Sequence, residues 1–245
     1  PLFRPGGHGA LLHNLAAISR AHPGALVSVK NIDNVRPTSA LGEVVPWRQA
    51  LIGRTADLMA SRDAALEALR EGEVGPAQDW LRQGVAHPGE AIPSGASELW
   101  SMLDRPLLVA GMVQNEGEPG GGPFWLRDDR GVLRSQIVES AEMDESDPVI
   151  QDRVGRATHF NPVDLVCAIH DDRGEPYDLD AFVDVSRDFL VSKSFAGQPL
   201  KGLEHPGLWN GAMGRWNTVF VEVDPRTFAP VKTVFDLLRP AHRSA

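Results

Sequence analysis

Three polar clusters, far apart in the chain, combine residue types that could bind a nucleotide together with a metal ion. The first, Gly6-Gly7-His8-Gly9, is a glycine turn that opens onto an apolar-periodic helix predicted over Ala10 to Arg20. The second, Asn31-Ile32-Asp33-Asn34, follows a β-like run at Ala25 to Lys30. The third, Pro230-Val231-Lys232-Thr233, places an isolated lysine before an apolar segment. Glycines let backbone N–H groups approach phosphates, a carboxylate can hold Mg²⁺, and a lysine neutralises phosphate charge.

Each of these clusters also has a purely structural interpretation. Gly6 to Gly9 could be an ordinary tight turn, because glycine permits positive φ. Asp33 could form a turn or cap a helix, as aspartate commonly does. Lys232 could be a solvated lysine at a helix start, but a cation there opposes the helix dipole. A bound anion would remove that conflict, which favours the phosphate interpretation.

A second set of residues could hold a sugar. The Asn115 to Gly122 loop is rich in glycine, which suggests that its backbone comes close to another group, although it could simply be flexible. Glu139 ends an apolar β-like run, where it could accept hydrogen bonds from sugar hydroxyls or pair with an arginine. We predict a turn at His159 to Pro162, in which the Asn161 amide could bind a hydroxyl or a base. Trp209-Asn210 could be a core aromatic with a capping amide, or the aromatic–amide pair that grips a sugar ring.

The order of these clusters resembles that of the UTP:sugar-1-phosphate uridylyltransferases (UDP-sugar pyrophosphorylases). The matching segments are Gly7-His8-Gly9, Asn31 to Asn34, Gly121-Gly122, Glu139, Phe160-Asn161 and Pro230 to Thr233. The resemblance implies catalytic roles for Lys232 and Asp33, with Asp33 holding Mg²⁺. It implies nucleotide binding by Gly7, His8, Gly9 and Asn31, and substrate binding by Gly121, Gly122, Glu139 and Asn161. The aromatic–amide pair at Trp209-Asn210 adds Asn210 to the predicted substrate-binding residues. The uridylyltransferases have an acid where this chain has Ala10 and a lysine where it has Pro119-Gly120, so their exact substrate does not carry over.

A closer resemblance extends over nearly the whole chain. It is to an uncharacterised bacterial family of nucleotidyltransferase-like proteins, a domain of unknown function, with the same layout. The shared strings are Phe3 to Gly9, Asn115 to Gly122 and Gly207 to Met213. In both families a strand and a glycine-rich phosphate loop precede the position of Pro1, and the chain starts without methionine. We therefore expect a fragment that lacks its N-terminal portion.

The composition of the chain excludes several classes of binding partner. The chain has 245 residues, 42% of them hydrophobic, which is enough for one sizeable core. A net charge of −9 argues against nucleic acid or an anionic membrane as the main partner. The lone Cys167 excludes an intrachain disulfide and fits a cytoplasmic protein. No apolar run approaches the roughly 20 residues of a membrane helix, and the oligomeric state is left open.

Strand and helix patterns alternate along the chain and indicate an α/β fold. Strands are predicted at Ala25 to Lys30, Arg105 to Val113, Phe124 to Leu126, Leu133 to Val138, Val163 to Ile169 and Thr218 to Val223. Helices are predicted over Val45 to Gly72 and Pro76 to Val85, followed by a loop over His87 to Gly95. We expect one domain over residues 1–245, with a helical insertion at about residues 43–100 that packs on the sheet or caps it. The resemblance implies a mixed sheet flanked by helices, as in nucleotide-diphospho-sugar transferases (GT-A-like).

The expected reaction is Mg²⁺-dependent transfer of a nucleotidyl group, uridylyl by resemblance, from a nucleoside triphosphate to a sugar-1-phosphate. The products would be an NDP-sugar and pyrophosphate. Two alternatives stay open, because function lives in the site and not in the fold. One is a catalytically silent protein that binds nucleotide or sugar, and the other is a glycosyltransferase that uses an NDP-sugar.

Overall fold

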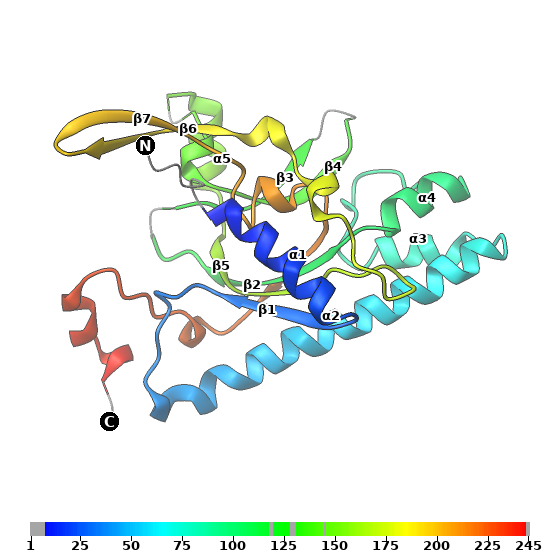
Figure 1. Ribbon diagram of the computed structural model, residues 1–245, viewed down its shortest axis with the longest axis horizontal. Coiled ribbons are helices and arrows are strands. Elements are labelled where there is room, and N and C mark those ends of the chain that lie inside the picture. Colours follow the sequence, from blue (N-terminus) through cyan, green and yellow to red (C-terminus); the bar gives the residue numbers. More distant parts are fainter. Residues whose placement is uncertain (1–7, 118–119, 128–130, 145, 244–245) are drawn as a thin grey trace.

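A computed structural model describes residues 8–117, 120–127, 131–144 and 146–243 (Figure 1). Its α-helices are α1 (Leu11–Ala21), α2 (Leu41–Arg70), α3 (Gly75–Leu81), α4 (Ala96–Leu103) and α5 (Pro148–Gly155). Its strands are β1 (Leu26–Lys30), β2 (Leu107–Gln114), β3 (Gly122–Arg127), β4 (Leu133–Val138), β5 (His159–Ala168), β6 (Phe189–Phe195), β7 (Gln198–Glu204) and β8 (Asn217–Glu222). Short 3₁₀ helices, labelled η, occur in the connecting segments.

The central sheet has four strands in the order β1-β5-β2-β8. Strand β5 runs antiparallel to both β1 and β2, and β8 runs parallel to β2. The sheet is therefore mixed, and the carboxyl ends of β1, β2 and β8 lie at the same edge as the amino end of β5. The expected α/β fold with a mixed sheet and flanking helices is confirmed.

Two apolar layers cover the two faces of this sheet. Along β2, Leu107 and Val109 contribute to one core cluster, whereas Leu108, Ala110 and Met112 contribute to the other. This alternation is the period of two that a strand buried on both faces requires. The first cluster contains side chains of α2, α3 and α4, and the second contains side chains of α1 and of residues 179–216. Figure 1 shows α1 and the long α2 on opposite sides of the sheet.

The helical region that we expected at residues 43–100 comprises α2, α3 and α4. It packs against the sheet, since Leu51, Leu58 and Leu66 are buried in the same cluster as the β2 and β5 side chains. Within the described residues, no helix combines the length and apolar character that crossing a membrane demands.

Sequence patterns located most elements but erred in several places. The turn predicted at His159 to Pro162 is wrong, because these residues form the first part of β5. Pro162 is tolerated there because it pairs with Met112 at a register shift, where a missing N–H breaks no regular ladder bond. Helices α4 and α5 and the β6–β7 hairpin were not predicted.

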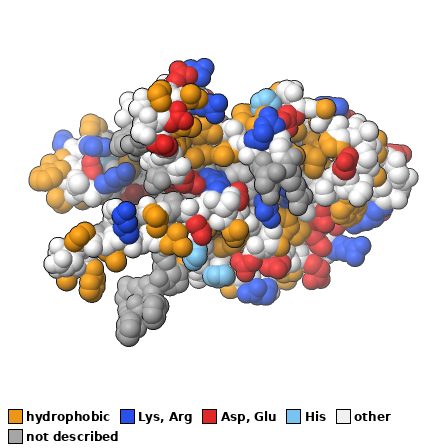
Figure 2. Space-filling view, turned by 90° about the horizontal axis from the view of Figure 1, so that it is seen from above, with side chains coloured by type: hydrophobic (Ala, Val, Ile, Leu, Met, Phe, Trp, Pro, Cys, Tyr) orange, Lys and Arg blue, Asp and Glu red, His pale blue; other side chains and the backbone are white. Residues whose placement is uncertain are grey.

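The β6–β7 hairpin projects from the body of the molecule (Figure 1). Its exposed large side chains include Leu190, Phe195, Leu200 and Leu203. Exposed hydrophobic side chains also occur on the 3₁₀ helix η8 (Val234–Leu238). Figure 2, seen from above, shows hydrophobic side chains at the left-hand end of the molecule, the end from which the hairpin projects.

One charged side chain is enclosed where α2 meets the sheet. Arg62 has no exposed surface, and its guanidinium donates to the carbonyls of Arg105 (3.1 Å) and His170 (3.0 Å). It also lies 2.8 Å from the neighbouring Asp63 carboxylate. Arg62 thus satisfies two backbone carbonyls from separate loops at the amino end of β2 and after β5.

We expect Arg62→Met to lower the free energy of unfolding by about 2–4 kcal/mol, because two carbonyls and a carboxylate lose their donor. Urea denaturation followed by circular dichroism measures this change. The exposed Arg82, which pairs with Asp79, supplies the matched control Arg82→Met, expected within about 0.5 kcal/mol of the wild type. Equal midpoints for the two variants would contradict this account of Arg62.

Candidate functional site

Several of the predicted site residues lie at the edge of the sheet formed by the carboxyl ends of β1, β2 and β8. Asp33 follows β1, and Gly121 and Gly122 follow β2, with Gly122 beginning β3. Asn161 lies near the amino end of β5, at the same edge. Ligands of open α/β sheets bind beyond the carboxyl ends of strands, so this edge is where a site is expected.

The segment after β1 is paired directly with the segment near the chain's carboxyl end. Val231 N–H donates to the carbonyl of Asp33 at 2.7 Å, and Asn34 forms an isolated antiparallel bridge with Pro230. The buried Asn34 amide accepts from Ala229 N–H (2.8 Å) and donates to the Thr227 carbonyl (3.0 Å). These bonds place the Asp33 backbone beside Val231, the residue that precedes Lys232.

The Asp33 carboxylate and the Lys232 ammonium have no partner among the residues that the structure describes. In the ranges that the structure describes, neither the Asp33 carboxylate nor the Lys232 ammonium makes a hydrogen bond or an ion pair. The nearby Asp236 carboxylate accepts instead from the backbone N–H groups of Lys232 (3.0 Å) and Thr233 (2.7 Å), and it pairs with Arg239 (2.7 Å). The backbone bonds lower the pKa of Asp236.

The helix expected after Lys232 is the five-residue 3₁₀ helix η8. The sequence argument from a helix dipole is therefore wrong, since so short a helix has only a small dipole. The case for Lys232 rests on its position beside Asp33.

A second group of predicted residues surrounds Trp209. The His8 ring stacks on the Trp209 indole, with the ring centroids 4.2 Å apart and the planes at 15°. The Glu139 Oε1 atom accepts from Trp209 Nε1 at 3.0 Å and lies 3.8 Å from His8 Nε2. Leu208 N–H donates to His8 Nδ1 at 2.8 Å, so the proton of the neutral ring is on Nε2, facing Glu139.

Burial lowers the pKa of His8 below its ordinary value of 6.5. The negative charges of Glu139, Glu204 and Glu142 act in the opposite direction but do not outweigh burial. Near neutral pH, His8 is therefore an uncharged ring that can donate from Nε2.

The arginine partner considered for Glu139 belongs to its neighbour Glu142. Arg187 lies 2.9 Å from the Glu142 carboxylate and also donates to the Ile137 carbonyl at 2.8 Å. The same Glu142 carboxylate accepts from the Glu139 backbone N–H (2.8 Å) and from Asn210 Nδ2 (3.2 Å). Glu142 and Arg187 thus support the site. Neither was predicted from the sequence, because their roles depend on contacts between residues far apart in the chain.

Asn210 is 1% exposed, and both ends of its amide are hydrogen-bonded within the protein, to Glu142 and to Gly211 N–H. The amide has a second N–H and a second acceptor lone pair, so these bonds do not by themselves exclude a ligand. Its substrate-binding role stays a prediction.

The glycines of the site are required by the protein's own packing. A Cβ on Gly9 would lie 2.0 Å from the Pro206 carbonyl oxygen, and one on Gly121 would lie 2.0 Å from the Val138 carbonyl oxygen. A Cβ on Gly122 would lie 2.7 Å from the His159 carbonyl oxygen. The predicted close approach of the glycine loop is therefore to strands β4 and β5, and it brings this loop against Glu139 and Asn161.

The other two predicted nucleotide-binding residues are Gly7 and Asn31. Gly7 lies outside the described residues. Asn31 is exposed, and its carbonyl accepts from Asn34 N–H at 3.2 Å within the turn that holds Asp33.

The predicted residues thus form two groups, one around Asp33 and Lys232 and the other around His8, Glu139 and Trp209. The order of the clusters in the sequence also predicts that His8, Asp33, Glu139 and Lys232 line one cleft, and this stays a prediction. Among the described residues, no three His, Cys, Asp or Glu side chains come together as a metal-binding cluster.

The fold and this site define a mixed α/β protein with polar loops at one edge of its sheet. The family described as a domain of unknown function (DUF4301) matches residues 1–243, and the chain belongs to that family. This confirms the resemblance to an uncharacterised family that was inferred from the sequence. No curated protein matches the chain.

Several solved structures show a distant similarity. A variant of UDP-glucose pyrophosphorylase from Leishmania major, in complex with UDP-glucose, is 17% identical over 67% of this chain and 38% of that chain, with a TM-score of 0.34. A UDP-glucose phosphorylase from Trypanosoma brucei is 20% identical over 61% of this chain and 32% of that chain, with a TM-score of 0.34. The matched part spans well under half of the length of either protein.

We expect His8 to titrate below pH 6.5, and we expect Glu139→Gln to lower its pKa further. The amide oxygen of the glutamine would still accept from Trp209, but the largest charge that favours the imidazolium would be gone. Imidazole ¹⁵N NMR across a pH series measures both values. Glu175→Gln, at an exposed site, is the matched control and should leave the titration of His8 unchanged. A higher pKa for His8 in Glu139→Gln would contradict the described geometry.

Proposed function

We propose that this protein is a nucleotidyltransferase that forms an NDP-sugar. An oxygen of a sugar-1-phosphate attacks the α-phosphorus of a nucleoside triphosphate, and the bond to pyrophosphate breaks. The resemblance of the sequence motifs to uridylyltransferases favours a uridylyl group and a GT-A-like arrangement. The observation that carries the proposal is the position of Asp33 beside Val231 and Lys232, with both charged side chains lacking partners in the described ranges.

The residues present fit Mg²⁺ as a cofactor. Mg²⁺ in nucleotide sites is held by one or two carboxylates together with waters and the substrate's phosphates, so a full cage of protein ligands is not needed. The partly exposed Asp33 carboxylate can supply one such ligand, because its backbone alone makes the contact with Val231. When bound there, the ion would supply positive charge against the phosphate oxygens.

Lys232 would supply the second positive charge. Its backbone is held by Asp236, which is in turn paired with Arg239, so the ammonium itself is left to meet a phosphate oxygen. Nucleotidyl transfer depends on positioning and on neutralising charge more than on acid–base groups. A fixed lysine beside the metal-binding carboxylate meets both requirements.

The sugar would lie at the glycine loop. The Asn161 Oδ1 atom is buried and has no hydrogen-bond partner in the described residues, which is costly unless a donor such as a hydroxyl completes it. Gly121 lies against β4 and Gly122 lies against β5, the strand that carries Asn161. The Glu139 carboxylate can accept from a second hydroxyl. The His8–Trp209 pair offers a flat surface and the neutral Nε2 donor toward the nucleotide.

A protein that binds without turnover is the second candidate. Internal hydrogen bonds already use part of the bonding capacity of Glu139 and Asn210, which leaves less of it for a sugar acceptor. Such a protein would bind nucleotide or sugar without turnover. The two candidates are separated by measuring binding and pyrophosphate release on the same samples.

The test is pyrophosphate release by the complete protein from UTP and other nucleoside triphosphates, each with a panel of sugar-1-phosphates and Mg²⁺. We expect Lys232→Ala to lower kcat about a hundredfold, because one preorganised charge is lost from the transition state. Lys232→Arg should recover little of this, since a planar guanidinium cannot occupy the same point as an ammonium. Lys201→Ala, on the exposed β7, is the control and should retain the wild-type kcat.

Three results have distinct meanings. Pyrophosphate release that depends on Lys232 supports the proposal. Nucleotide binding with no release for any sugar-1-phosphate would establish the silent binder instead. Release with equal kcat in Lys232→Ala and the wild type would remove Lys232 from the reaction.

A further inference from the structure

A cavity of about 620 Å³ lies at the outer edge of β8. It is bounded by α2, the segment after α3, the β3–β4 hairpin and the ends of β2, β5 and β8. Its lining includes Arg54, Phe124, Trp125, His159, Phe220 and Glu222. These residues differ from those of the His8–Glu139–Trp209 group and of the Asp33–Lys232 group.

The edge of β8 presents backbone hydrogen-bonding groups to this cavity. In a parallel ladder, alternate residues direct their N–H and C=O groups toward the partner strand. Asn217 N–H donates to Pro106 and Val223 N–H donates to Met112, so the odd-numbered residues of β8 face β2. Phe220 therefore directs its N–H and C=O away from β2, as does Thr218, whose carbonyl accepts from Ser135 Oγ at 2.7 Å. The Phe220 N–H and C=O are thus an adjacent donor and acceptor on the side of β8 away from β2, and Phe220 lines the cavity.

The opposite wall is aromatic. Trp125 is 41% exposed although it lies on a strand of the hairpin, and Phe124 lines the cavity beside it. His87 contacts the Trp125 ring edge-on, with centroids 4.8 Å apart and an interplanar angle of 87°. This contact holds the indole in place, and a held, exposed aromatic face suits the stacking of a flat ring.

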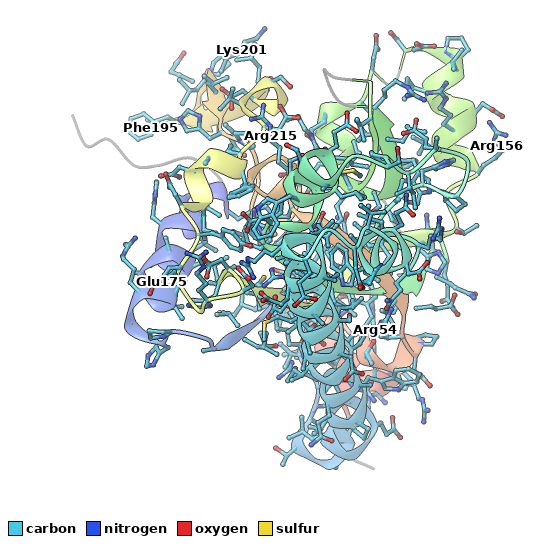
Figure 3. The ribbon with its side chains drawn as sticks, turned by 90° about the vertical axis from the view of Figure 1, so that its right-hand side faces the viewer. Arg54, Arg156, Glu175, Phe195, Lys201 and Arg215 are labelled. Atoms are coloured by element: carbon cyan, nitrogen blue, oxygen red, sulfur yellow. The ribbon has the colours of Figure 1, made fainter. Side chains whose placement is uncertain are left out.

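Two charged side chains of the cavity, Glu222 and Arg54, differ in whether the protein supplies them with a partner. The Glu222 carboxylate is held by His159 Nε2 at 2.9 Å and by Gln114 Nε2 at 3.2 Å. Arg54 projects from α2 (Figure 3) and makes no hydrogen bond or ion pair with the described part of the chain. A guanidinium with no internal carboxylate, at the mouth of an aromatic cavity, favours an anionic ligand.

We propose that this cavity binds a small planar anion: a flat ring stacked on Trp125, with an amide-like edge paired to the Phe220 backbone and an anionic group at Arg54. Carboxylate and phosphate are equally suited to the guanidinium. The proposal does not depend on the proposed transferase reaction, because it uses different residues and its test measures binding alone.

Orotate is the probe that carries all three features, a planar ring, an amide edge and a carboxylate. Uracil lacks the carboxylate and benzoate lacks the amide edge, so they test each requirement separately. Titration calorimetry on the complete protein gives the affinities, and the indole N–H signal of Trp125 in ¹H–¹⁵N NMR gives the location. We expect orotate to bind at least about tenfold more tightly than uracil or benzoate and to shift the Trp125 signal.

Two variants complete the test. Arg54→Gln should weaken orotate binding about tenfold or more, since it removes the charged partner of the carboxylate. Trp125→Ala should weaken binding by removing the stacking face. Arg156→Gln, on the exposed surface beside α5, should leave binding unchanged and controls for the loss of one positive charge.

To separate carboxylate from phosphate ligands, the same titration is repeated with uridine monophosphate. A shift of the Trp125 signal that needs Arg54 would extend the site to phosphates, and an orotate-only response would restrict it to carboxylates. Absence of orotate binding at millimolar concentration, equal affinity in Arg54→Gln, or perturbation of His8 in place of Trp125 would each overturn the proposal.

Discussion

The buried amide of Asn34 is the contact on which the candidate site depends. Its two ends are bonded to Thr227 and Ala229, so the turn after β1 is tied to the segment near the carboxyl end of the chain. The bond from Val231 to the Asp33 carbonyl extends the same pairing. Because the side chain of Asn34 is committed to structure, that of its neighbour Asp33 can be left for chemistry. The mixed sheet brings the other site loops to the same place, since β5 pairs with both β1 and β2 and so aligns their carboxyl ends at one edge.

The two groups of site residues differ in their internal pairing. Asp33 and Lys232 keep their charges unpaired within the described ranges, which suits transient contact with phosphates. Glu139 is bonded to Trp209, and its neighbour Glu142 is held by Arg187, so this group is preorganised by the protein itself. Side chains that the protein already holds in place need little rearrangement when a ligand binds. Because their charges are paired internally, they contribute to the shape of the site more than to its charge. Such a division is consistent with phosphate chemistry at the first group and with recognition of the sugar or the base at the second.

Much of the fold and part of the site could be read from the sequence. The periodic patterns of α1, α2 and the core strands are local, and the shared strings Phe3 to Gly9, Asn115 to Gly122 and Gly207 to Met213 pointed to the family that matches the chain. The sequence predicted that Asp33 and Lys232 act at one site, but it did not predict the backbone bond between Val231 and Asp33, because no residue type signals such a bond between distant segments. The close approach of the glycine loop was predicted, but its protein partner was not: Gly121 meets the carbonyl of Val138, and its substrate-binding role stays a prediction. The turn predicted at Asn161 failed because Pro162 is accommodated by a register shift visible only in the paired strands.

The central claim is that Asp33 holds the metal of a bound nucleotide beside Lys232. Paramagnetic broadening by Mn²⁺ in place of Mg²⁺ tests it directly, with UTP present and backbone amide signals observed by NMR. The account predicts that the amides of Asn34 and Val231 broaden first and that Asp33→Asn largely abolishes the effect. The Asp171–Asp172 turn, an acidic segment elsewhere in the chain, serves as the internal control and should stay sharp. Broadening centred on that turn, or unchanged broadening in Asp33→Asn, would contradict the account.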